Sequence, residues 1–162
     1  MDRIIKQSFS QERAKFVPVQ TTKTYEIAGE EGDLLAAKSI LLVEDEAIYA
    51  EILKEYLETF NYRVVIASDG VQGLKKIMEK DFDLVICDLL MPNLPGDMFY
   101  VAVERVKPHL ARRFIFITGH QENPKIADFV KKTKSLTLFK PFEMHVLMET
   151  ILAALKTSRK KD

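Results

Sequence analysis

Five short apolar runs, separated by stretches of helical period, constrain the fold of this chain more than any other feature. The runs begin roughly twenty to thirty residues apart, and they are Ile40–Val43, Val64–Ala67, Leu84–Cys87, Phe114–Ile117 and Leu136–Phe139. They are nearly all apolar, as strands buried on both faces must be, whereas strands of an antiparallel sheet with one solvent-exposed face would alternate apolar and polar residues. The sequence therefore predicts repeated β-α-β units and an α/β fold with a parallel five-stranded sheet.

Apolar residues between the runs recur at helical spacing, and these faces are expected to cover the sheet. The first face carries Ile48, Ile52, Leu53, Tyr56 and Phe60, and the second carries Val71, Leu74, Ile77 and Met78. Asn123 followed by Pro124 predicts an N-cap and the start of a helix over Ile126, Phe129 and Val130. Pro141 is expected to open the last helix, with an apolar face of Phe142, Val146, Leu147, Ile151 and Leu155.

The composition of the chain changes near residue 38. Residues 1–37 mix charges with short apolar patches and are too short to fold alone, so we expect an N-terminal extension or linker, with a helix over Met1–Phe16 as one alternative. Residues 38–157 are expected to form one domain, and residues 158–162 a polar, basic tail. The 162 residues are about one domain on length alone.

Charge and cysteine content exclude several classes of function. Lys plus Arg and Asp plus Glu number 24 each, so no net charge favours nucleic acid or anionic lipid. The single cysteine, Cys87, lies inside an apolar run, which indicates a core residue and fits a reducing compartment. The sequence shows neither an apolar run long enough to span a membrane nor a secretory signal. We therefore expect a cytoplasmic protein that binds neither nucleic acid nor membrane.

Polar residues of a particular kind follow four of the five runs. They are Glu44 and Asp45 after the first, Asp88 after the third, Thr118 after the fourth and Lys140 after the fifth. The second run leads only to a turn at residues 68–70. In an open parallel sheet the carboxyl ends of the strands line one rim, where ligands bind. Three carboxylates, one hydroxyl and one ammonium are therefore expected to meet there.

Such a group of carboxylates requires positive charge. Two carboxylates about 4 Å apart repel by about 4 kcal/mol at an effective dielectric near 20. Lys140 supplies one positive charge, and a divalent cation would balance the remaining negative charge. Ligands that offer only oxygen atoms favour Mg²⁺ over zinc. Asp88 would then attack phosphorus while Lys140 neutralises charge and Thr118 donates a hydrogen bond. The sequence predicts an acyl phosphate on Asp88.

These residues resemble the receiver domain of two-component response regulators, over about residues 38–157. The matching segments are Ile40–Glu46, Asp88–Pro92, Thr118 with Gly119, and Lys140–Phe142. The resemblance implies a (βα)5, flavodoxin-like, doubly wound parallel sheet with strand order 2-1-3-4-5. It also implies a cis peptide bond between Lys140 and Pro141.

The resemblance further implies a role for each residue at the rim. Asp88 would be phosphorylated, Thr118 would report phosphorylation and Lys140 would contact the phosphoryl group. The ligands of Mg²⁺ (or Mn²⁺) would be Glu44, Asp45, Asp88 and the backbone carbonyl of Leu90. The donor would be a phosphohistidine on a histidine kinase or a histidine phosphotransfer protein. The domain would be a regulatory phosphoacceptor that assists its own phosphorylation and dephosphorylation, not an enzyme, and its downstream protein partner is unknown.

Three positions depart from the family pattern. Glu44 stands where the family most often has Asp, a substitution expected to preserve metal binding, and Gly119 follows Thr118 where a small residue is typical. Thr137 occupies the position where the family usually has an aromatic residue that takes part in its conformational switch, so the residue that would take this part here is undecided. Phe139 points to the same face of the strand as Thr137 and is one candidate. This pattern is similar to that of receivers attached to hybrid histidine kinases, an analogy only.

Two other functions compete with that of a receiver domain. A haloacid-dehalogenase-like, Mg²⁺-dependent phosphohydrolase also uses an Asp nucleophile, but it needs a second Asp two residues later, where this chain has Leu90. A degenerate receiver that acts as a constitutive scaffold stays open. His120 is expected either to be a solvated loop residue or to tune acyl phosphate hydrolysis. The chain has no room for a DNA-binding or enzymatic output domain, so output is expected to pass through protein contacts, with homodimerisation through the last two helices left open.

Overall fold

The computed structural model describes residues 37–157, so the predictions for the N-terminal extension up to residue 36 and for the tail at 158–162 lie outside the described residues. The strands are β1 (Ser39–Val43), β2 (Arg63–Ala67), β3 (Leu84–Asp88), β4 (Phe114–Thr118) and β5 (Leu136–Phe139). The helices are α1 (Ala47–Glu58), α2 (Gly70–Glu79), α3 (Gly96–Val106), α4 (Pro108–Ala111), α5 (Pro124–Thr133) and α6 (Met144–Thr157). No helix among these residues is long and apolar enough to cross a membrane.

All five strands are parallel and lie in the order β2-β1-β3-β4-β5, which confirms the predicted fold class and strand order. Val43 pairs with Ala67 and Cys87, and Thr118 pairs with Phe139, so the carboxyl ends of the strands share one rim of the sheet. The residues that follow the strands are thereby brought to that rim.

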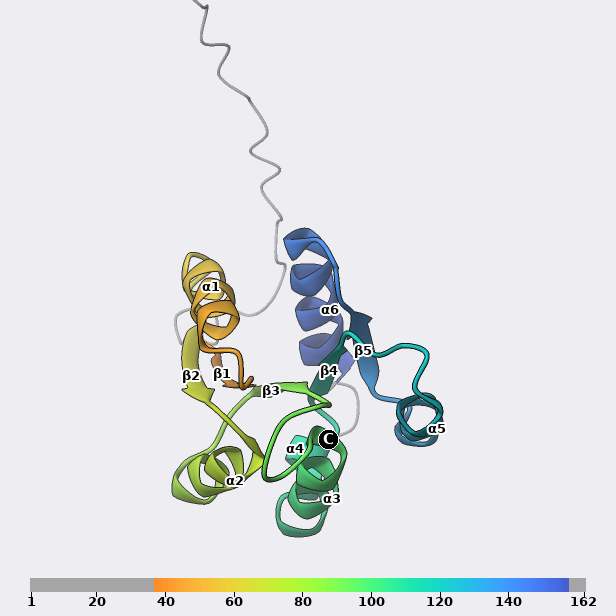
Figure 1. The fold of residues 1–162 in the computed structure, drawn as a ribbon. Coiled ribbons are helices and arrows are strands. Elements are labelled where there is room, and N and C mark those ends of the chain that lie inside the picture. The colour runs from red at the N-terminus through yellow and green to blue at the C-terminus, as the bar shows by residue number, and fades with distance from the viewer. Residues whose placement is uncertain (1–36, 158–162) are drawn as a thin grey trace, which may run out of the picture.

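Helices cover both faces of the sheet (Figure 1). Ile40 and Leu42 of β1 belong to a core shared with α1 and α6, while Leu41 and Val43 belong to a core shared with α2, α3 and α5. Successive side chains of a strand point to opposite faces, so burial on both sides requires an unbroken apolar run. Cys87 is fully buried in the second core, as predicted.

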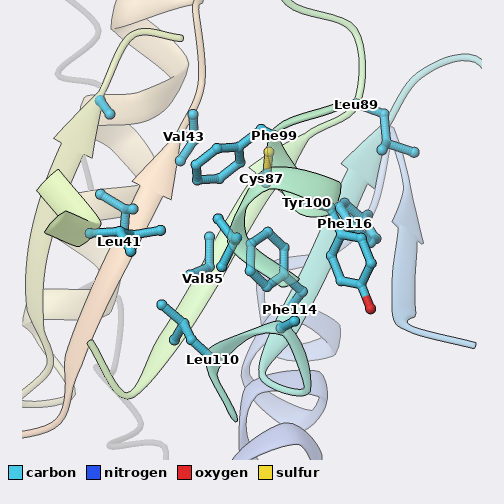
Figure 2. Packing of buried hydrophobic residues seen from close by; sticks show 14 of the residues in the cluster. Leu41, Val43, Val85, Cys87, Leu89, Phe99, Tyr100, Leu110, Phe114 and Phe116 are labelled. Carbon is cyan, nitrogen blue, oxygen red and sulfur yellow. The ribbon is translucent and has the colours of Figure 1, made fainter. Parts of the chain in front are cut away.

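An aromatic cluster fills the core beneath α3 and α5. The ring of Tyr100 on α3 lies edge-on to Phe114, Phe116 and Phe129, with centroids 5.2, 5.6 and 5.8 Å away. Edge-to-face contacts at these separations are favourable beyond the area they bury. Figure 2 shows Tyr100 beside Phe116, with Phe99 and Phe114 in the same layer. The cluster joins α3, β4 and α5.

The predicted inner faces of the first two helices were partly wrong. Leu53 is buried as predicted, together with Ala50 and Leu57, but Ile48, Ile52 and Phe60 are exposed, Ile48 by 78%. The helix thus has apolar residues on two sides, and only one of these sides meets the sheet.

The inner face of α2 also differs from the prediction. Ile77 is buried and Leu74 packs against the core, as predicted, but Val71 and Met78 are exposed and the other buried residues are Gly70 and Gly73. A Cβ on Gly73 would lie 3.0 Å from the ring of Phe99, so glycine lets the helix approach closely. A pattern of large apolar residues does not identify buried glycines of this kind.

Two helix starts were predicted, and one is confirmed. The Asn123 side chain accepts a hydrogen bond from the Lys125 N–H at 3.0 Å and caps α5. The prediction that Pro141 opens the last helix was wrong, because Phe142 first packs against the core and α6 begins at Met144. The peptide bond between Lys140 and Pro141 is cis, as predicted.

Between β3 and β4 lie α3 and the single turn α4, where the spacing predicted room for one helix.

Candidate functional site

Three carboxyl groups meet at the rim of the sheet. Glu44 and Asp45 follow β1 and Asp88 ends β3, and one oxygen atom of each lies within 4.8 Å of the others. Glu44 and Asp88 are buried, at 2% and 7% exposure, while Asp45 is exposed. The strand order explains the meeting, because β1 and β3 are neighbours in the sheet although the paired residues Leu41 and Val85 lie 44 positions apart in the sequence.

 The pairing of β1 with β3 is thus what brings Glu44 and Asp88 together.

Lys140 follows β5 and reaches across the rim to both buried carboxylates. Its Nζ lies 2.8 Å from Asp88 Oδ2 and 3.0 Å from Glu44 Oε2. The remaining oxygen of each carboxylate accepts a backbone hydrogen bond: Asp88 Oδ1 from the Leu90 N–H at 2.9 Å, and Glu44 Oε1 from the Glu46 N–H at 3.2 Å. One ammonium therefore bridges two of the three clustered carboxyl groups.

The pKa values of Glu44 and Lys140 are both raised. Burial raises the pKa of Glu44, the charge of Asp88 adds to the shift, and the hydrogen bond from Lys140 opposes it. Burial lowers the pKa of Lys140, but the hydrogen bonds to Asp88 and Glu44 outweigh this effect and raise the pKa overall. The ammonium form of Lys140 is thus stabilised by the two carboxylates it bridges.

Thr118 ends β4 at the same rim and is fully buried. Its Oγ1 accepts a hydrogen bond from the His120 N–H at 3.1 Å, and its backbone oxygen accepts one from the Lys140 N–H at 2.8 Å. The second bond links the end of β4 to the start of the segment that carries Lys140. His120 itself is exposed, which agrees with the loop position expected for it.

Tyr49 belongs to the site, although it was not among the predicted site residues. Its ring lies against Lys140, with Nζ 4.5 Å from the ring centroid, a separation at which a cation is attracted to an aromatic face. Tyr49 lies in the first turn of α1, four residues after Asp45, which precedes the helix. An aromatic residue at this spacing from a predicted metal ligand was the available signal.

Asp69 also has more contacts than a turn residue needs. It caps α2 by accepting a hydrogen bond from the Gln72 N–H at 2.8 Å, and its second oxygen accepts one from Asn93 Nδ2 at 2.9 Å. The Gln72 and Asn93 hydrogen bonds lower the pKa of Asp69. Asp69 thus connects the end of β2 to the loop that follows Asp88.

The donor set at the rim fits a hard divalent cation. The three clustered residues Glu44, Asp45 and Asp88 offer only oxygen atoms, and a single ammonium leaves the group with excess negative charge. Magnesium prefers oxygen ligands and retains waters that an incoming group can displace. The residues present therefore fit such an ion.

Comparison with known proteins points to one family. A family model, the response regulator receiver domain, matches residues 40–152. The transcriptional regulatory protein ZraR of Klebsiella oxytoca is 30% identical over 120 residues, which cover 74% of this chain and 27% of that protein. The response regulator ArlR of Staphylococcus epidermidis is 33% identical over 125 residues, which cover 76% of this chain and 55% of that protein. The chain thus spans between about a quarter and about half of these relatives.

A solved structure shows the same likeness. The CheY-like response regulator receiver domain protein of Methanospirillum hungatei superimposes with a TM-score of 0.72 at 26% sequence identity. The match covers 78% of this chain and 100% of the other. Sequence and structure comparisons therefore agree on one kind of domain.

Proposed function

Because the chain belongs to the response regulator receiver domain family, we propose that it accepts a phosphoryl group from a phosphohistidine donor onto Asp88 in a Mg²⁺-dependent reaction. Residues 38–157 form this receiver, and it signals through protein contacts. The donor is a histidine kinase or a histidine phosphotransfer protein. Such donors receive their phosphoryl group from ATP, so we place the protein in the cytoplasm.

The observation that carries this proposal is the bridge made by Lys140. One Asp88 oxygen is held by the Lys140 ammonium and the other by the Leu90 N–H, so both oxygens of the carboxylate are held in place while each keeps a free lone pair. A positioned carboxylate beside a cation is what attack on a phosphoryl group requires, since most of the catalysis of this reaction comes from positioning and charge neutralisation.

The transfer itself exchanges one bond for another. An Asp88 oxygen forms the new bond to phosphorus while the bond between phosphorus and the imidazole nitrogen of the donor breaks, and the imidazole leaves with the electron pair. Lys140 shifts with the phosphoryl oxygens and neutralises their charge, and the Thr118 hydroxyl donates a hydrogen bond to one of them. Glu44, Asp45, Asp88 and the Leu90 carbonyl would hold Mg²⁺, which would supply further charge neutralisation when bound.

The test is intact-mass analysis after incubation with acetyl phosphate and Mg²⁺. Wild type is expected to gain the mass of one phosphoryl group, which hydroxylamine removes because an acyl phosphate is labile. Asp88→Asn is expected to gain none. Asp97→Asn is the matched control, because Asp97 is an exposed carboxylate in the first turn of α3, the helix that follows the same loop.

The outcomes separate the alternatives. A single labile adduct that depends on Asp88 and on Mg²⁺ supports the proposal, and transfer from a phosphorylated histidine phosphotransfer domain would extend it to the physiological class of donor. No adduct on wild type contradicts the proposal and favours the constitutive scaffold.

A further inference from the structure

The loop between β3 and α3, residues 89–95, is tied to the start of α2. Asn93 Nδ2 donates a hydrogen bond to Asp69 Oδ2 at 2.9 Å. Asp69 is buried, at 9% exposure, and its other oxygen already caps α2 through Gln72. Capping explains one oxygen of Asp69 but not the other, which is directed at a loop 24 residues further along the chain.

The backbone of this loop is specified at three more points. Asn93 has a φ of 65°, in the left-handed region that asparagine tolerates better than most residues. A Cβ on Gly70 would lie 2.5 Å from the Leu94 carbonyl oxygen, so the helix start and the loop are packed as closely as glycine permits. The Gly96 N–H donates to the Leu89 carbonyl at 3.1 Å and closes the loop.

The same loop controls the phosphoacceptor. Leu90, three residues before Asn93, donates the backbone hydrogen bond that holds Asp88 Oδ1. Any rotation of the loop about its ends would redirect this N–H, and with it the carboxylate oxygen it holds. The position of Asp88 therefore depends on what fixes residues 89–95.

We propose that Asp69 and Asn93 are positioning residues of the phosphoacceptor site. Their hydrogen bond fixes the 89–95 loop so that the Leu90 peptide groups are already arranged for Asp88 and for the cation. This inference rests on the function proposed above, because the arrangement matters only if Asp88 accepts a phosphoryl group. Residues that orient metal ligands through hydrogen bonds commonly affect metal affinity although they do not touch the ion.

Two substitutions remove the hydrogen bond between Asn93 and Asp69 and are chosen to keep the neighbouring backbone and helix cap. Asn93→Gly removes the amide but retains a residue that adopts the left-handed backbone. Asp69→Ser retains a short oxygen acceptor for the cap of α2 but not the reach to Asn93. Asn61→Gly is the matched control, because Asn61 also has a positive φ, of 63°, in the turn between α1 and β2.

Three measurements apply to each protein. Hydrogen–deuterium exchange on the metal-free protein reports the protection of residues 89–95, titration calorimetry gives the Mg²⁺ dissociation constant, and acetyl phosphate gives the phosphorylation rate. We expect Asn93→Gly and Asp69→Ser to exchange faster in the loop and to bind Mg²⁺ roughly three- to tenfold more weakly. Asn61→Gly is expected to match wild type in all three, and circular dichroism checks that each variant is folded.

The proposal has distinct ways to fail. The proposal is overturned if loop exchange or Mg²⁺ affinity in both variants equals that of wild type. It is also overturned if the loop exchanges faster but Mg²⁺ affinity and phosphorylation rate are unchanged, because the hydrogen bond between Asp69 and Asn93 would then contribute to stability alone. A wild-type protein that takes no phosphoryl group overturns the proposed function, and this inference with it. Failure of the inference alone is recognised by a wild type that is phosphorylated normally beside variants that behave identically.

Discussion

Removal of the Lys140 ammonium tests the electrostatics of the rim directly. The substitution Lys140→Met keeps much of the aliphatic stem but leaves Glu44 and Asp88 without the cation that bridges them. We expect the metal-free domain to lose stability at pH 7 because two buried carboxylates would then face each other and Asp45 without a cation between them.

The size of the loss follows from the geometry. Carboxylate oxygens within 4.8 Å of one another repel by about 3.5 kcal/mol per pair at an effective dielectric near 20. Removing one partner from a buried ion pair typically costs about 3–5 kcal/mol. The Lys140 side chain is 26% exposed, so solvent screens part of the interaction and the lower end applies. We expect a loss of about 3 kcal/mol.

The pH dependence has a definite sign. The folded-state pKa of Glu44 is raised above its ordinary value of 4.5, mainly by burial. A raised folded pKa means that the contribution of Glu44 to stability is fully present below pH 4.5 and is lost as the pH rises through the folded pKa. Removing Lys140 raises that pKa further, so the gap between variant and wild type should widen from pH 5 to pH 7.

The assay is urea denaturation at low salt, at pH 5 and pH 7, in EDTA and in Mg²⁺. Bound cation stabilises the folded state by mass action, and it should stabilise the variant more than wild type because the ammonium no longer competes for the carboxylates. Lys107→Met is the control, since Lys107 pairs with the exposed Asp81 and should change stability much less. A gap that is the same at both pH values and unaffected by Mg²⁺ would refute the electrostatic reasoning and indicate lost packing.

Three further predictions concern single side chains. Gly96→Ala should lower the free energy of unfolding by about 1–3 kcal/mol, because a Cβ there would overlap the carbonyl oxygen that ends β3, whereas Gly119→Ala, whose nearest neighbour would be 4.0 Å away, should be tolerated; thermal denaturation compares them. Asn123→Ala should cost about 1 kcal/mol through loss of the α5 cap, measured by urea denaturation. Tyr49→Leu should cost about 1 kcal/mol in the metal-free protein through loss of the cation–π contact with Lys140, whereas Tyr49→Phe keeps the ring; equal losses in both would contradict this account.

The fold was predictable because it depends on a strong signal. Strands buried on both faces must be apolar throughout, and residues such as Leu41 and Leu42, which face opposite cores, make this visible in the sequence. The meeting of Glu44, Asp45 and Asp88 followed from the rule that parallel strands end at one rim.

Helix faces were less predictable because large apolar residues are not always the buried ones. Ile48 is exposed while Ala50 is buried, and Gly73 faces the core where Val71 does not. The sequence carries no measure of how closely two elements approach, so small residues at tight contacts are overlooked. The same reason hid Asp69 and Tyr49, whose roles depend on contacts between segments that the strand pattern alone does not place together.

The position of β5 at an edge of the sheet has a consequence for synthesis. The ribosome makes the acidic residues of the rim well before Lys140, which arrives with the last strand. A nascent chain that has already paired β1 with β3 would hold mutually repelling anions until that strand docks. A divalent cation bound by these carboxylates would offset their repulsion until Lys140 arrives, and so would assist assembly of the rim.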